Sequence, residues 1–289
     1  MPTMDAKRRY TLTLSCPDRV GIVAAVSSFL ARHQGWIVEA NHHADNDSVR
    51  YFMRQEILAD SLPFGLGEFT RLFAPIAKEF GMQWRISDSA RKHRVVILVS
   101  REDHCLYDLL YRWRAQEFNF EVACVISNHD VLRGFVEWHG IPFHHLPVTP
   151  EAKPQAFAEL VRLFEQYRGD TLVLARFMQI LPPEVCAAYP GRIVNIHHSF
   201  LPSFVGARPY HQAHARGVKL IGATCHYVTA ELDAGPIIEQ DTVRVDHGDS
   251  VEDLVRYGKD IEKAVLARGL RYHVEDRVLL DGNKTVVFR

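Results

Sequence analysis

Three side chains in the second half of the sequence have the chemistry needed to promote attack on an acyl group: Asn195, His197 and Asp233. Asn195 and His197 continue the apolar residues 193–194, which predict a buried strand, and residues two apart on a strand point to the same face. An amide and an imidazole can stabilise an oxyanion, and a carboxylate can orient or deprotonate a water. Because no nucleophilic serine or cysteine motif lies nearby, we predict direct attack through a tetrahedral intermediate.

The segments around this strand predict the sheet that must position these side chains. Apolar β-branched runs alternate with helically spaced apolar residues, which is typical of a doubly wound parallel sheet with its active site at the carboxyl ends of the strands. Parallel strands are expected near residues 95–99, 121–126, 141–144, 171–174 and 193–196. After them we expect an antiparallel pair at 222–228 and 235–245, a long helix at 251–266 and a hairpin at 279–288.

The first part of the chain predicts a smaller domain. Its strand and helix patterns follow the order βαββαβ, which is the split ferredoxin-like unit, and Asp18 is expected to cap the first helix. Polar and basic residues then predict a linker at 88–94. The expected organisation is a first domain at 1–87, this linker, and a second domain at 95–289.

Composition excludes several classes of function. The formal net charge of −1 provides no electrostatic footprint for nucleic acid or an anionic membrane. No apolar run reaches the ~18 residues of a membrane span, and the N-terminus lacks the apolar core of a signal peptide. The five cysteines are scattered without a C-x-x-C pair, so we expect reduced thiols in the cytoplasm and no metal site.

The stretch Asp18-Arg19-Val20-Gly21-Ile22, together with the βαββαβ order, resembles the ACT domain family of small-molecule sensors. The resemblance implies an amino-acid effector held at a subunit interface, with Asp18, Gly21 and Ile22 as candidate contacts. Free N–H groups at a helix N-terminus can receive a carboxylate, and glycine permits its close approach. The alternative is a domain that only mediates assembly. Either way a homo-oligomer is expected, for which a tetramer is one candidate.

The second domain resembles the folate-dependent formyltransferases, which have a Rossmann-like fold. The resemblance rests on Asn195-Ile196-His197, Leu201-Pro202, Leu232-Asp233-Ala234-Gly235-Pro236 and the segment 174–181. It implies catalytic roles for Asn195, His197 and Asp233. It also implies folate contacts from Met178, Gln179, Ile180, Leu181, Thr229 and Leu232.

Departures from the formyltransferase pattern favour water as the acceptor. Residues 100–106 contain no glycine where nucleotide-binding members have a phosphate cradle, and their two carboxylates would repel a phosphate. His198 stands where the transferases have proline or a small residue; it is a candidate for the water site, with simple packing as the alternative. The added N-terminal domain makes the chain resemble the formyltetrahydrofolate deformylases.

This resemblance implies hydrolysis of 10-formyltetrahydrofolate to formate and tetrahydrofolate, which supplies formate for purine synthesis without a prosthetic group. We expect Asp233 to accept a proton from water with a pKa raised by burial, while Asn195 and protonated His197 stabilise the oxyanion. Two alternatives remain. One is a formyltransferase with an amine acceptor, and the other is a folate-binding regulator without catalysis.

Overall fold

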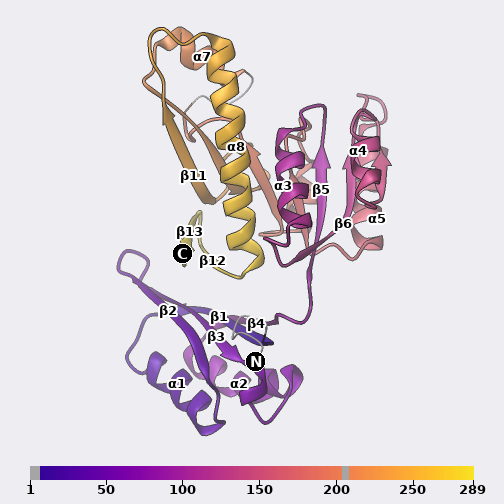
Figure 1. Ribbon diagram of the computed structural model, residues 1–289. Helices are drawn as coiled ribbons and strands as arrows, with labels where there is room; N and C mark the ends of the chain where they lie inside the picture. The colour runs from indigo at the N-terminus through magenta and orange to yellow at the C-terminus, as the bar shows by residue number, and fades with distance from the viewer. Residues whose placement is uncertain (1–6, 204–207) are drawn as a thin grey trace. The chain divides into compact units, whose positions relative to one another are not determined.

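A computed structural model describes residues 7–203 and 208–289, which divide into two compact units (Figure 1). The first unit contains the chain up to Lys92 together with Glu275–Arg289, and the second unit is His93–Val274. Among the described helices, none combines the length and the apolar character needed to cross a membrane.

The first unit contains a four-stranded antiparallel sheet in the order β2-β3-β1-β4. The order βαββαβ along the chain confirms the predicted ferredoxin-like arrangement. Its elements are β1 (Arg9–Pro17), α1 (Ile22–Arg32), β2 (Ile37–Asp45), β3 (Arg50–Leu58), the 3-10 turn Ala59–Ser61, α2 (Leu66–Phe80) and β4 (Gln83–Asp88).

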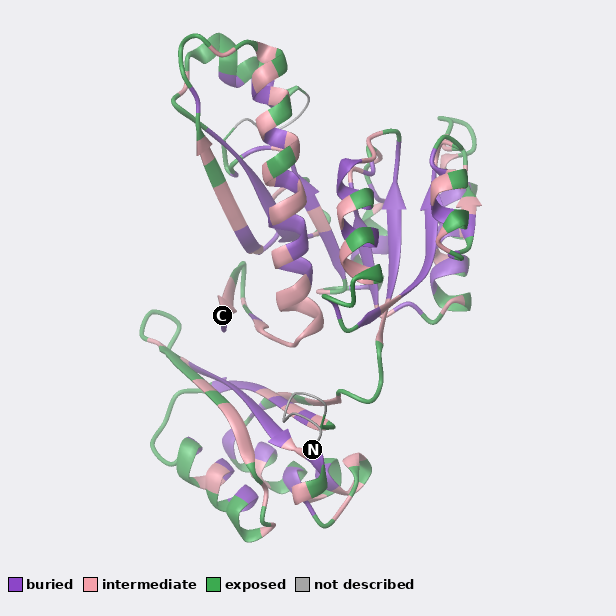
Figure 2. Cartoon of the chain, viewed as in Figure 1, coloured by how far each residue is buried: buried purple, intermediate pink, exposed green. Residues whose placement is uncertain are grey.

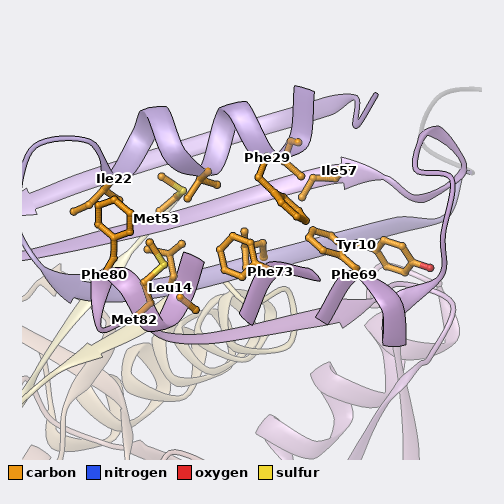
Figure 3. Close-up of a cluster of buried hydrophobic side chains, with 14 of the residues drawn as sticks. Tyr10, Leu14, Ile22, Phe29, Met53, Ile57, Phe69, Phe73, Phe80 and Met82 are labelled. Carbon is orange, nitrogen blue, oxygen red and sulfur yellow. The ribbon is translucent and has the colours of Figure 1, made fainter. Parts of the chain in front are cut away.

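The core of the first unit lies between one face of this sheet and its two helices, as Figure 3 shows. Side chains alternate along a strand, so Met53 and Ile57 of β3 join the core while Arg54 and Glu56 face the other way. The helices contribute residues at helical spacing, including Phe29 from α1 and the fully buried Phe69 and Phe73 from α2.

The opposite face of the same sheet is covered by the last residues of the chain. The hairpin of β12 (Val278–Asp281) and β13 (Lys284–Val287) packs Leu279 and Phe288 against Phe52. The buried Arg54 donates hydrogen bonds of 3.0 and 3.2 Å to the carbonyl of Glu275. The sequence predicts the hairpin correctly but places it in a domain spanning 95–289, and that boundary is wrong because these contacts belong to the first unit.

The start of α1 also differs from the prediction. Gly21, not Asp18, occupies the N-cap position, with a φ of 100° that favours glycine, and no side chain caps the helix. Asp18 and Gly21 are exposed, whereas the Ile22 side chain is part of the core. Of the three candidate effector contacts, Asp18 and Gly21 are therefore accessible to a ligand and the Ile22 side chain is not.

The second unit is built on a seven-stranded sheet in the order β11-β10-β9-β8-β5-β6-β7. Strands β9, β8, β5, β6 and β7 are parallel to one another. The antiparallel pair and the long terminal helix are confirmed as predicted. Its elements are β5 (His93–Val99), α3 (His104–Arg114), β6 (Phe120–Ser127), α4 (Arg133–Trp138), β7 (Phe143–His145), α5 (Lys153–Gln166), β8 (Thr171–Leu174), α6 (Pro183–Ala188), β9 (Ile193–His197), α7 (Pro209–Arg216), β10 (Leu220–Tyr227), β11 (Ile237–Arg244) and α8 (Val251–Val274).

Helices bury the central strands of this sheet, which Figure 2 shows as buried. The run Val95–Val99 is fully buried, as its continuous apolar character predicts. Helix α5 packs Phe157 and Leu160 against side chains of β5 and β8, and α8 lies against β9, β10, β11 and α3. The chain proceeds from β5 outward to β6 and β7, then returns across β5 to β8 and β9. The order therefore reverses between β5 and β8, where open sheets place ligands at the carboxyl ends of the strands.

Candidate active site

Strand β9 brings Asn195 and His197 to the carboxyl end of the parallel sheet. The strand pairs with β8 through Leu174 and Asn195, and with β10 through the pairs Asn195–His226 and His197–Thr224. Apolar residues flank the two polar ones and are buried, so the strand is anchored in the core while Asn195 and His197 share one side.

His197 and Asp233 form a hydrogen-bonding pair. The Nδ1 atom of His197 lies 3.3 Å from Oδ1 of Asp233, and both side chains are at most 8% exposed. Nε2 of His197 is buried without a hydrogen-bond partner. Since Nδ1 faces the carboxylate, Nε2 is the atom that remains available to a ligand.

The loop that carries Asp233 is fixed by a close backbone contact. Asp233 has a positive φ of 54°, and two residues later a Cβ on Gly235 would lie 1.9 Å from the carbonyl oxygen of Tyr227. The Tyr227 N–H donates a 2.9 Å hydrogen bond to the carbonyl of Pro236. Only glycine allows this approach, which holds the loop against the end of β10 and directs Asp233 to His197.

The pKa of Asp233 corrects one expectation from the sequence. Burial raises this pKa, but the hydrogen bond from His197 and the charge of that imidazole outweigh it, so the pKa lies below the ordinary aspartate value. The predicted raised pKa is wrong because it counted burial without this partner. Asp233 is therefore a carboxylate at neutral pH.

His226 is a site residue that the sequence does not reveal. Its Nδ1 contacts the carbonyl of Tyr227 at 2.8 Å and thus carries the proton, which leaves Nε2 to accept a 3.1 Å hydrogen bond from Nδ2 of Asn195. Burial lowers the pKa of His226, in keeping with a neutral ring. This contact fixes the Asn195 amide and leaves its second N–H for a ligand. The feature that identifies His226 as a site residue is its pairing with Asn195 across β9 and β10, which appears only once the strand register is known.

All predicted catalytic and folate-contacting residues line one pocket of about 290 Å³. The exposed apolar side chains of Met178, Ile180 and Leu232, between 52% and 59% exposed, stand at this pocket. Such side chains on a concave surface are typical of a site for a flat apolar ligand. The pocket therefore combines an apolar binding surface with the polar groups of β9 and the Asp233 loop. The predicted residues around it are Met178, Gln179, Ile180, Leu181, Asn195, His197, His198, Thr229, Leu232 and Asp233.

His198 lies in the wall of this pocket beside His197. Their ring centroids are 5.2 Å apart, and the His198 ring is 6.0 Å from that of Tyr210. Burial lowers the pKa of His198 to about 3, with the charge of Arg176 contributing in the same direction. A neutral imidazole therefore faces the site at physiological pH.

Behind the pocket, Glu262 of α8 is buried with partners from α3, from α7 and from the loop after β8. It lies 2.8 Å from Nε2 of His104, accepts a 2.7 Å hydrogen bond from Tyr210, and forms an ion pair of 3.3 Å with Nε of Arg176. Burial raises the pKa of Glu262, but these partners lower the pKa by a larger amount, so the net shift is downward.

His104, Cys105 and Glu262 are also close enough to hold a metal ion, and they are the one such group found in the described residues. Burial and the charge of Glu262 raise the pKa of the Cys105 thiol well above its usual value, which disfavours a thiolate ligand. Arg176 already supplies the cation at Glu262. The donor set fits an internal ion-pair network better than a metal centre.

Comparison with known proteins agrees with this geometry. Residues 93–270 match the family model described as Formyl transferase. Together with the parallel sheet and the Asn195, His197 and Asp233 cluster, the match defines a catalytic domain of the formyltransferase class. The chain is 47% identical over 286 residues to the formyltetrahydrofolate deformylase of Corynebacterium sp. (strain P-1), covering 99% of this chain and 100% of that one.

Comparison with solved structures distinguishes between members of the formyltransferase class. A crystal structure of a formyltetrahydrofolate deformylase from Pseudomonas syringae pv. tomato has 64% sequence identity and a TM-score of 0.98, covering 99% of this chain and 96% of that one. The chain belongs to the formyltetrahydrofolate deformylase family and is a hydrolase. By contrast, glycinamide ribonucleotide transformylase 1 from Symbiobacterium toebii is 32% identical with a TM-score of 0.64, covering 68% of this chain and 95% of that one.

Proposed function

We propose that the pocket between the Met178–Leu181 segment and the Asp233 loop hydrolyses 10-formyltetrahydrofolate to formate and tetrahydrofolate. The observation that carries this assignment is the His197–Asp233 pair, whose unpartnered Nε2 is buried in a pocket that Asn195 also lines. Membership of the deformylase family supports the substrate. The released formate can supply purine synthesis, and its release balances the pool of one-carbon folates.

The folate binds with its ring system against the exposed apolar side chains of Met178, Ile180 and Leu232 and the neighbouring backbone. Gln179, Leu181 and Thr229 complete this surface. Apolar burial supplies most of the affinity, and the few polar groups fix orientation. The formyl group then lies at the carboxyl end of β9.

Hydrolysis begins with attack of a water on the formyl carbon. Asp233 accepts a hydrogen bond from this water, and the remaining Asn195 N–H together with protonated His197 stabilises the oxyanion. As the new C–O bond forms, the attacking oxygen becomes strongly acidic, so an ionised carboxylate can take its proton without a raised pKa. One proton reaches the amine nitrogen of tetrahydrofolate as the C–N bond breaks, and formate leaves. Each step uses side chains of this chain and assigns none to a prosthetic group.

The test is to incubate the purified protein with 10-formyltetrahydrofolate alone and to measure formate and tetrahydrofolate. Hydrolysis yields the two products in equal amounts without any added amine. A transferase would release formate only at a background rate until an amine is supplied. A folate-binding regulator would bind the substrate and release neither product, which would contradict the proposal.

We also propose that the first unit mediates homo-oligomer assembly, with a tetramer as one candidate, and that an amino-acid effector binds near Asp18 and Gly21. The exposed start of α1 and the edge position of β2 support this. Because Gly21 has a positive φ, Asp18→Ala is a cleaner variant than a bulky residue at Gly21. Titrating amino acids while following formate release and oligomer size tests both parts. No response in either measurement would rule out the effector and leave an assembly role alone, and a monomer at every concentration would contradict the assembly role.

The protein is proposed to act in the cytoplasm. All five cysteines are buried and free, which suits a reducing compartment. Fractionation of the native host with an antibody against the chain would test this location, and recovery with secreted proteins would contradict it.

A further inference from the structure

The proposed hydrolysis does not use the network behind the pocket, and its position there requires an explanation. Glu262 is 1% exposed and its partners come from separate elements: His104 at the start of α3, Tyr210 on α7, and Arg176 just after β8. A buried ion pair of this kind contributes little to stability, because the desolvation of the charges offsets their attraction. A role in holding one side chain in place is a better account.

Arg176 is the member of this network that reaches the active site. Its side chain is 12% exposed and lines the same pocket as Asn195, His197 and His198, whereas His104, Tyr210 and Glu262 do not line it. Its backbone has a positive φ of 64°, a conformation that favours glycine. The chain therefore has a long cationic side chain at a position whose backbone conformation favours glycine.

The anchor of Arg176 is itself built to be rigid. Tyr210 reaches Glu262 because Gly258 leaves room for it: a Cβ on Gly258 would lie 2.1 Å from the Tyr210 ring. His104 approaches Glu262 from the residues after β5, the stretch that lacks a glycine-rich cradle. Lys259 pairs with Glu102 at 2.8 Å and extends the network along the same side.

We propose that Arg176, anchored by Glu262, fills the part of the active-site pocket that an amine acceptor would need, so that water is the nucleophile that reaches the formyl carbon. Arg176 is thus a specificity-determining residue, and His104, Tyr210 and Glu262 position it. The inference rests on the proposed hydrolysis and explains its choice of acceptor.

The two reactions differ in the bond that forms. In hydrolysis a water oxygen bonds to the formyl carbon and the C–N bond to tetrahydrofolate breaks. One water proton passes to the tetrahydrofolate nitrogen, and formate and the other proton are released. In transfer an amine nitrogen bonds to the same carbon, the same C–N bond breaks, and a proton from the amine passes to tetrahydrofolate. No oxidant or other reactant is needed in either case, so the products reveal which nucleophile arrived.

The experiment gives the full-length protein 10-formyltetrahydrofolate labelled in the formyl carbon, with glycinamide as the amine, and measures formate and N-formylglycinamide against a blank without protein. Arg176→Gly removes the side chain and suits the observed backbone. The ratio of N-formylglycinamide to formate should rise by about tenfold or more over wild type, the usual scale on which pocket shape discriminates. An unchanged ratio in a folded variant that still turns over would overturn the proposal.

Two further variants keep the proposal testable. Arg176→Met retains the bulk without the charge and should keep the wild-type ratio, so a ratio as high as that of Arg176→Gly would contradict a role for volume. Glu262→Gln weakens the ion pair that holds Arg176 and should raise the ratio of N-formylglycinamide to formate by a smaller factor. This variant replaces Arg176→Gly as the test if Arg176→Gly fails to fold or to turn over. A wild-type ratio in Glu262→Gln would then contradict the proposal. Formate release by wild type without glycinamide tests the proposed hydrolysis separately.

Discussion

At the scale of single residues, the site is a set of side chains whose protonation is decided by contact with one another. Asp233 stays ionised because His197 donates to it, and His226 is neutral while it holds the amide of Asn195. Isolated pKa values would misassign these roles, since each depends on a neighbour brought from another strand or loop.

Asp233→Asn should abolish turnover while leaving folate binding nearly unchanged. A carboxamide has the same shape but cannot take the water proton or balance a protonated His197, so the turnover rate should fall by on the order of a thousandfold or more. Formate release and folate binding by calorimetry are the measurements. Turnover within about tenfold of wild type would remove Asp233 from this role.

Asn195→Ala and His197→Ala should each lower the maximal rate by roughly a hundredfold or more, as loss of one oxyanion donor does in other enzymes. Because both act on one developing charge, the double variant should lose less than the product of the two single losses. Single-turnover formate release provides the comparison. Full multiplicativity would show that the two side chains serve separate steps.

His198 should make the protein less stable in mild acid. Its pKa is about 3 in the folded state, below that of an unfolded histidine near 6.5. The unfolded state therefore binds more protons between these values, and stability falls as the pH decreases through that window. From pH 7 to 5 the loss is roughly 2 kcal/mol from this residue.

Urea unfolding of His198→Gln should show a smaller loss between pH 7 and pH 5 than wild type does. His214→Gln, on the exposed side of α7, is the matched control. Equal losses in wild type and His198→Gln would contradict a buried neutral ring.

At the scale of elements, the site depends on loops held tightly to strand ends. Strand β9 supplies two of the three proposed catalytic groups, but Asp233 reaches them only because its loop passes close to the end of β10. The geometry of the site is thus set by backbone contact as well as by side chains.

Gly235→Ala should displace this loop. The added Cβ would meet the carbonyl oxygen of Tyr227, so the backbone must shift, and we expect a loss of roughly 2 kcal/mol in stability and a lower turnover rate. Gly134→Ala, where no atom lies within 4 Å of the new Cβ, is the control and should be neutral or slightly stabilising. Thermal unfolding and formate release measure both effects. Equal behaviour of the two variants would mean that the loop is not restrained at Gly235.

At the scale of the whole molecule, the chain returns to its first unit after completing the second. Helix α8 ends the second unit at Val274, and the next residues cover the face of the first sheet that carries Phe52 and Arg54. The last 15 residues, Glu275–Arg289, are therefore part of the folding of the N-terminal unit.

Phe288→Ala should weaken the first unit and spare the second. Phe288 is 8% exposed against Phe52 and Leu279, so its truncation should cost about 3 kcal/mol. Hydrogen exchange of peptides from β3 should quicken, while peptides from β8 and β9 serve as the internal control. Faster exchange in β9 with none in β3 would contradict this assignment of the C-terminal residues.

The sequence by itself determined the order of the elements and the candidate site. Apolar periodicity is a local signal, so the βαββαβ order, the parallel strands and the terminal helix could be predicted. Asn195, His197 and Asp233 could be named because their types and spacing suit acyl chemistry. The predicted folate contacts at 178–181 rest on a resemblance to a family motif, and these residues line the same pocket.

Only the tertiary structure decided which of these groups touch and what they do to one another. The unit to which the hairpin belongs, the Asn195–His226 contact, the lowered pKa of Asp233 and the anchoring of Arg176 by Glu262 all join residues far apart in sequence. Periodicity shows which face of an element is buried, but strand register and chain path decide which faces meet. Burial raises the pKa of Asp233 while His197 lowers it, so the direction of the net shift follows from which groups meet and not from the residue type.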